Sequence, residues 1–168
     1  MSLSMYQASA PVLLHALKTF EAILDKAAAH AEARKIDQSV FINARLAPDM
    51  LPFSAQLQIA TDMSKGAVAR LAGLEAPRME DNEKTFAELK TRLQKTQEFI
   101  RTVSADQIDG SEGRDIVMKA GPNTLEFKGQ AYLLHFVFPN VFFHLTTAYD
   151  ILRHNGVELS KRDFLGSF

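Results

Sequence analysis

Apolar residues recur every three or four positions through most of this 168-residue chain. That spacing predicts long amphipathic helices, because the apolar side chains then collect on one helical face. The first helix is expected from Ser9 or Pro11 to about Ala33, with a buried stripe of Leu13, Leu17, Phe20, Leu24 and Ala27. His15 and His30 lie off this stripe, so both are predicted to face solvent.

Two further helices are predicted between residues 52 and 103. One begins at Pro52 and stops at about Ala72, because Gly73 accepts the left-handed conformation that ends a helix. Its apolar face is rich in small residues: Phe53, Leu57, Ala60, Ser64, Ala67, Val68 and Leu71. The next spans about Asn82 to Val103, with Asn82 or Asp81 as its cap. Its charged residues predict a solvated face: Lys84, Glu88, Lys90, Arg92, Lys95 and Glu98.

Two segments interrupt the helical pattern. Residues 35–51 contain Val40, Phe41, Ile42 and Leu46, which are too apolar for a free linker. We therefore expect an ordered loop that packs over the core and covers one end of a pocket. Residues 115–128 contain two β-prone runs, DIVMK and TLEFK, on either side of AGPN. Such runs around a Gly-Pro-Asn turn predict a β-hairpin.

The most apolar stretch of the chain follows the hairpin. A helix is predicted from Gln130, with a kink or restart at Pro139 and a stop at Asn155-Gly156. At 100° per residue, one face collects Val141, His144, Leu145, Ala148, Ile151 and Leu152. The tail contains Phe164, Leu165 and Phe168, so it is expected to dock on the body of the protein.

These elements together predict an all-α fold. Its architecture is expected to be an antiparallel up-down four-helix bundle with a small β-hairpin inserted before the last helix. The length fits a single domain over residues 1–168.

Composition excludes several classes of function. The net charge is −1 and no run of five basic residues occurs, so nucleic acid is not an expected partner. Cysteine is absent, which excludes disulfides, thiolate metal sites and a cysteine nucleophile. No apolar run approaches the roughly 20 residues that span a bilayer. The first residues lack the pattern of a signal peptide, so a cytoplasmic protein is expected.

His144 is the polar member of the last helix's apolar face. It is either a core histidine satisfied by hydrogen bonds, or a ligand or general base in an internal cavity. Asn140 lies one turn earlier, Gln56 borders the face of the second helix, and Tyr149 offers a phenol, so these residues with His144 form the candidate small-molecule site. No two histidines are spaced to share an ion. A zinc or nickel site would therefore rest on His144 alone among imidazoles, and amides are poor ligands for such metals.

Three blocks of sequence resemble a known group of proteins: SLSMYQASAPVLLHALKTFEAILDKAAAHAEARKID, ARLAPDMLPFSAQLQIATDMSKGAVARLAG and FHLTTAYDILRHNGVELSKRDFLG. They resemble the DinB/YfiT-like superfamily of four-helix bundles, and more closely a bacterial family there known only as a domain of unknown function. The resemblance implies the bundle fold and a homodimer.

The superfamily is similar to thiol-dependent transferases and isomerases that bind a divalent metal with three histidines. One histidine comes from the second helix, and two come from a His-x-x-x-His motif on the last. The last-helix motif corresponds to Asn140 and His144, and only His144 matches. Near the second-helix position stand Gln56 and Gln58.

The departures from the superfamily motif imply a ligand-binding bundle with a degenerate metal site. The alternative is a metal-dependent, thiol transferase-like enzyme in which His144 is a ligand or an acid/base. A purely structural role in an assembly is the third reading.

Overall fold

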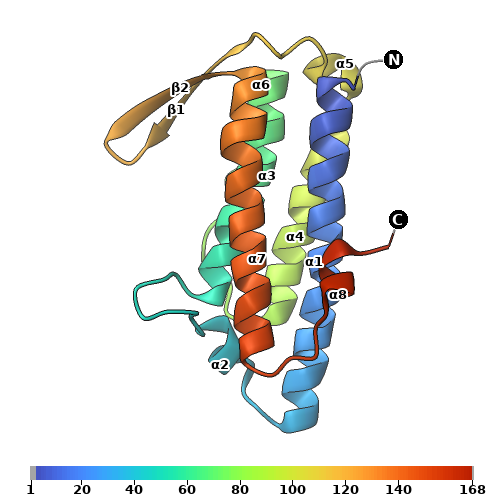
Figure 1. Ribbon diagram of the computed structural model, residues 1–168, viewed down its shortest axis with the longest axis vertical. Helices are drawn as coiled ribbons and strands as arrows, with labels where there is room; N and C mark the ends of the chain where they lie inside the picture. The colour runs from blue at the N-terminus through green and yellow to red at the C-terminus, as the bar shows by residue number, and fades with distance from the viewer. Residues whose placement is uncertain (1–2, 168) are drawn as a thin grey trace.

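The computed structural model describes residues 3–167, and its body consists of long helices that lie side by side (Figure 1). The four longest are α1 (Met5–Arg34), α3 (Phe53–Ala72), α4 (Phe86–Thr102) and α7 (Phe138–His154). Helix α3 packs mainly on α7 and α4, whereas α1 packs mainly on α4. The protein is thus mostly helical, as predicted.

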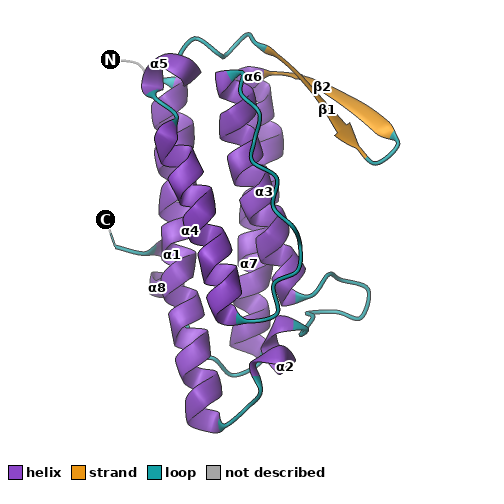
Figure 2. Ribbon diagram, turned by 180° about the vertical axis from the view of Figure 1, so that it is seen from behind, coloured by secondary structure: helices purple, strands orange, loops and turns teal. Residues whose placement is uncertain are grey.

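The directions of the helices differ from the predicted up-down order. Helices α1 and α7 run one way along the long axis, whereas α3 and α4 both run the other way (Figures 1 and 2). Residues 73–85 return along the length of the molecule as an extended loop (Figure 2). The prediction failed because it treated this connection as short. About a dozen extended residues reach roughly 40 Å, which exceeds the roughly 30 Å length of a helix such as α3.

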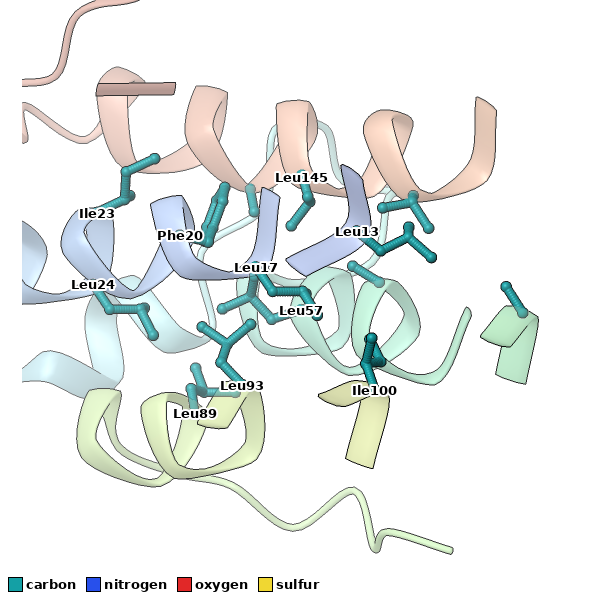
Figure 3. Packing of buried hydrophobic residues seen from close by; sticks show 14 of the residues in the cluster. Leu13, Leu17, Phe20, Ile23, Leu24, Leu57, Leu89, Leu93, Ile100 and Leu145 are labelled. Atoms are coloured by element: carbon teal, nitrogen blue, oxygen red, sulfur yellow. The ribbon is translucent and has the colours of Figure 1, made fainter. Parts of the chain in front are cut away.

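The core lies between the long helices. Leu17 of α1, Leu57 of α3 and Leu93 of α4 converge at its centre and are fully buried (Figure 3). Burying one such side chain stabilises the fold by about 1.5–3 kcal/mol. The predicted stripes of α1 and α3 are buried throughout, and so are the apolar residues of the predicted α7 face. Helical periodicity therefore identified the core correctly.

Helix ends follow capping chemistry. Helix α1 begins at Met5, earlier than predicted, because Ser4 and Gln7 form a capping box. Helix α4 begins at Phe86, where Thr85 and Glu88 form a second one. The predicted start at Asn82 or Asp81 was therefore wrong. Gly73 ends α3 with φ 70°, as predicted.

The charged face predicted for α4 is exposed at Lys84, Glu88, Lys95 and Glu98, but the side chain of Arg92 is buried. Its guanidinium binds Glu83 at 2.9 Å, Asp62 at 2.7 Å and Asp81 at 3.0 Å, and it donates a 2.7 Å hydrogen bond to Thr61. Burial alone would raise the pKa of Glu83, but hydrogen bonds from Gln58 and Arg92 lower it overall. This network joins α3, α4 and the loop between them.

The hairpin is confirmed and projects beyond the long helices (Figure 1). Strands β1 (Asp115–Ala120) and β2 (Asn123–Lys128) pair antiparallel, with Ile116 opposite Phe127. A short helix, α5 (Ala105–Ile108), precedes them. Gly129 comes directly after β2 and packs against the backbone of Ser111. A Cβ added to Gly129 would lie 2.0 Å from the Ser111 carbonyl oxygen.

The helical stretch after the hairpin is continuous but not uniform. Helix α6 (Gly129–Ala131) leads into a π-helical segment, η1 (Tyr132–Val137), and then into α7. The Phe138 N–H bonds to the Leu133 carbonyl, five residues back. A π turn just before Pro139 widens the helix where proline supplies no N–H, so the helix passes through without a break.

The predicted loop at 35–51 is partly helical. Helix α2 (Gln38–Ile42) buries Phe41 and Ile42, whereas Val40 and Leu46 are exposed. At the other end of the chain, α8 (Lys161–Leu165) lies against α1 and half-buries Phe164, so the tail docks as predicted. Leu165, the second residue of that prediction, is exposed, and the third, Phe168, lies outside the described residues. Within residues 3–167, no helix is long and apolar enough to cross a membrane.

Candidate functional site

The centre of the candidate site is a hydrogen bond between α7 and α3. His144 is half-buried in the first half of α7, and its Nδ1 lies 2.7 Å from Oε1 of Gln56. Gln56 stands in the first turn of α3 and is 1% exposed. The structure therefore brings together two of the four residues predicted for the site.

The partners of Gln56 determine which nitrogen of His144 carries the proton. The Gln56 amide nitrogen donates to the Leu51 carbonyl at 3.0 Å, and a carbonyl can only accept. Its Oε1 is thus the atom that faces the imidazole, and Nδ1–H of His144 must donate to it. In the neutral ring, Nε2 then keeps its lone pair. No hydrogen bond from a described residue reaches Nε2.

The environment keeps this imidazole neutral. Burial lowers the pKa of His144 below the ordinary 6.5, because desolvation disfavours the charged ring. The neighbouring Phe143 ring packs edge-on at 5.3 Å between centroids. At neutral pH the site consequently presents an uncharged acceptor nitrogen with a fixed ring orientation.

The loop before α3 lies beside this pair. Gln56 binds its Leu51 carbonyl, and Arg45 Nη1 bonds to the Met50 carbonyl at 2.8 Å. Leu46 and Leu51 of this loop and Phe143 of α7 are all exposed. The loop is thus tied directly to the histidine's partner and offers apolar surface nearby.

The other two predicted residues have different partners. Asn140 donates its amide to the Phe136 carbonyl at 2.7 Å, within its own helix. Tyr149 packs edge-on against Phe164 of α8, with ring centroids 5.8 Å apart. Five residues of an α-helix turn through about 140°, so Tyr149 faces away from His144. The phenol therefore belongs to the contact with the tail.

Gln56, Asn140 and His144 line none of the larger cavities found so far among the described residues, which lie beneath α8, beside the Arg92 network and at α2. The pocket predicted at these residues therefore stays a prediction. Two of the cavities instead lie beneath α8, where His15 lines both.

The histidines predicted to face solvent also have partners. His15 Nε2 donates to the Leu165 carbonyl at 2.7 Å and is half-buried under the tail. His30 is half-buried as well, with its ring edge-on to Phe41 at 5.8 Å. The prediction that they face solvent was wrong because residues outside their own helix, Leu165 and Phe41, pack against them.

Comparison with known proteins places this arrangement in a family. The model of the family described as Domain of unknown function (DUF1993) matches residues 5–165. The chain belongs to the DUF1993 family. The crystal structure of a DinB family member protein from Shewanella denitrificans is similar over 97% of this chain and 92% of that one, with 38% identity and a TM-score of 0.88. No curated protein matches the chain.

The DUF1993 site does not fit a three-histidine metal centre. His144 supplies the single imidazole, and its Nδ1 is used by Gln56. The Gln56 and Asn140 amides are bound to backbone carbonyls. Within residues 3–167, no group of three or more histidines or carboxylates is placed to hold a metal ion.

Sequence reasoning located Gln56 and His144 but missed the interaction between them. Gln56 was chosen for the site over Gln58, two positions later, because it borders the apolar face of its helix. Gln58 donates to Glu83 at 2.9 Å, so it belongs to the Arg92 network. The helical angle of Gln56 was the usable signal, since this residue lies within one turn of the buried Phe53 and Ala60. The hydrogen bond to His144 could not be predicted, because it depends on how α3 and α7 pack.

Proposed function

We propose that this DUF1993 protein binds a small molecule beside the loop at residues 43–52, with His144 Nε2 as the acceptor for a donor group on the ligand. The observation that carries this proposal is the chain of hydrogen bonds from the Leu51 carbonyl through Gln56 to His144 Nδ1. It fixes the tautomer and leaves one neutral nitrogen available. A histidine that served only as core would gain nothing from an open Nε2.

The first test is metal content, measured by plasma mass spectrometry on untagged protein purified without chelators. We expect no stoichiometric metal in the unaltered protein. The same measurement on His144→Ala and on His154→Ala controls for adventitious binding, because His154 is an exposed histidine of the same helix. Near-stoichiometric zinc, nickel or iron that disappears only in His144→Ala would replace this proposal with the metal-dependent one.

The second test asks whether the binding of small molecules depends on His144. A panel of hydrogen-bond donors, such as phenols, thiols and amides, is screened by ligand-detected NMR. Binding that is lost in His144→Ala and kept in His154→Ala supports the proposal. Binding that is unchanged in His144→Ala, with the fold intact by circular dichroism, contradicts it.

A thiol-transfer enzyme is the second candidate function. A neutral imidazole oriented by a hydrogen bond at Nδ1 can take a proton from a thiol, which is the arrangement of a general base and its orienting group. The lowered pKa of His144 favours this role, because the ring is in its basic form at neutral pH. Glutathione with chlorodinitrobenzene is a simple probe. A rate above background that falls in His144→Ala, but not in His154→Ala, would favour the enzyme.

The resemblance also leads us to propose that the four long helices form a four-helix bundle, that the protein is a homodimer, and that it is located in the cytoplasm. The bundle assignment is supported by the close packing of α3 on α7 and α4. Light scattering at several protein concentrations tests the dimer, and a monomer throughout would contradict it. Cell fractionation tests the location.

A further inference from the structure

A cavity separate from the His144 site lies where α1, α7 and α8 meet. Helices α1 and α7 make few contacts with each other, and α8 lies across the outside of α1 (Figure 1). The cavity between them has a volume of about 410 Å³. Small-molecule sites typically fall between about 300 and 1,000 Å³, so this space is large enough for a ligand.

The walls of this cavity are almost wholly apolar. The residues that define the apolar chamber are Val12, Ala16, Phe142, Leu145, Phe164 and Leu165. Three of them, Val12, Phe142 and Leu165, are among the exposed large hydrophobic side chains of the protein. Gathering exposed apolar groups around one hollow is costly in water unless something covers them.

A second cavity continues from the chamber and is charged. The two share His15 and Leu165, and the second is lined by Lys18, Lys161 and Arg162. Among the described residues these three cations form no ion pair. The acid beside them, Asp163, is bound by Lys26 at 2.6 Å. The mouth of the apolar chamber therefore has a surplus of positive charge.

The tail that forms one wall is held firmly against α1. His15 donates to the Leu165 carbonyl, and the Phe164 ring meets Tyr149 of α7. Gly166 has φ 74°, and a Cβ there would lie 2.5 Å from Thr19 Oγ1. The chamber is thus a fixed feature of the fold, and its ligand would not have to order the wall.

We propose that this chamber binds an aliphatic carboxylate, with its hydrocarbon chain between α1, α7 and α8 and its carboxylate at Lys18 and Arg162. An apolar hollow contributes through burial of the chain. The adjoining cations select an anionic head group over a neutral or cationic one, because charge-assisted hydrogen bonds are the stronger ones. The proposal is independent of the His144 site, which lies on other residues of α7 and on α3.

The test uses decanoate, decanol and decyltrimethylammonium, which share the chain and differ in the head group. Titration calorimetry on the full chain should show saturable, one-to-one binding of decanoate, at least about tenfold tighter than decanol. Decyltrimethylammonium should bind more weakly than decanol. Equal affinity for all three, or no saturable binding of decanoate, would overturn the proposal.

Variants separate the head-group contacts from the chamber. Lys18→Gln with Arg162→Gln should reduce decanoate affinity to that of decanol and leave decanol unchanged, whereas Lys95→Gln, an exposed lysine of α4, should change neither. Ala16→Leu fills the chamber and should abolish both, whereas Ala29→Leu, at an exposed alanine of the same helix, should not. If Ala16→Leu bound decanoate as the unaltered protein does, the proposal would be wrong.

A further variant keeps the test independent of core packing. Leu165 is 43% exposed, so Leu165→Asp should fold normally and repel the carboxylate from the mouth of the chamber. We expect decanoate affinity to fall at least about tenfold. If light scattering instead shows that Leu165→Asp turns a dimer into a monomer, and decanoate does not bind the unaltered protein, the chamber is an interface between two copies and the proposal fails.

Discussion

Gln56 Oε1 and His144 Nδ1 lie 2.7 Å apart and join the first turn of α3 to α7. The same glutamine holds the Leu51 carbonyl of the preceding loop. A single buried amide therefore sets the proton position on the imidazole and the position of the loop. Both properties depend on one side chain, which makes the relationship easy to test.

The first prediction concerns the protonation of His144. Proton NMR titration should give a midpoint below 6.5 for this ring, because burial lowers its pKa. The unfolded chain takes up a proton at the ordinary value before the folded protein does. The contribution of His144 to stability is thus complete above pH 6.5 and is lost as the pH falls toward the folded pKa. Nitrogen shifts should identify the tautomer with hydrogen on Nδ1. A midpoint at or above 6.5 would contradict the assignment.

The second prediction concerns Gln56. Gln56→Ala leaves both the His144 Nδ1–H and the Leu51 carbonyl without their partner, which should lower the free energy of unfolding by about 1–3 kcal/mol. Urea denaturation measures the loss. Gln94→Ala is the matched control, because Gln94 is an exposed glutamine of α4 and its change should stay within about 0.5 kcal/mol. Equal effects in the two variants would mean that the buried amide carries no special role.

The third prediction concerns the buried Arg92. Its side chain is 2% exposed and contacts three carboxylates. Arg92→Leu removes the cation and leaves Glu83 half-buried without it, which should cost about 3–5 kcal/mol. Lys95→Leu, at an exposed position of the same helix, should change the free energy of unfolding by no more than about 0.5 kcal/mol. A small loss in Arg92→Leu, measured by urea denaturation, would show that the network contributes little to stability.

The fourth prediction concerns two glycines near the hairpin. Gly129→Ala would bring a Cβ within 2.0 Å of the Ser111 carbonyl oxygen, which belongs to backbone and cannot swing away. The free energy of unfolding should fall by about 3 kcal/mol. At Gly113 nothing lies within 4 Å of an added Cβ, so Gly113→Ala should be tolerated. Thermal denaturation of the pair gives the comparison, and similar midpoints would refute the steric argument.

Periodicity was enough to predict the helices and their buried faces, but not their directions. Helical spacing describes one helix at a time, so nothing in it required α4 to run parallel to α3. The start of α4 was mistaken because Asn82 and Thr85 are both good caps. Glu83 lies in the loop before α4, where Arg92 binds its carboxylate. That choice depends on a guanidinium nine positions away, which local capping rules do not include.

The candidate site was predicted by residue but not by geometry. The resemblance placed His144 and Gln56 near each other, and the structure joins them by a hydrogen bond. Tyr149 was grouped with them through its chemistry alone, although its helical angle from His144 places it against α8. The cavities beneath α8 were not predicted, because their walls come from three distant segments. The apolar pair Phe164-Leu165 showed that the tail docks, but not where.

The π turn of η1 changes the direction in which side chains after it point, relative to those before it. Gly129, just before it, packs closely against Ser111, and the hydroxyl of its first residue, Tyr132, accepts a hydrogen bond from Arg70 at 2.9 Å. After the turn, His144 is hydrogen-bonded to Gln56. Adding or removing one residue turns an α-helix by about 100°. The hydrogen bonds of Tyr132 and His144 therefore form together only because the π turn accommodates an extra residue between them. Removing one residue from this turn would rotate either Tyr132 or His144 by about 100° away from its partner.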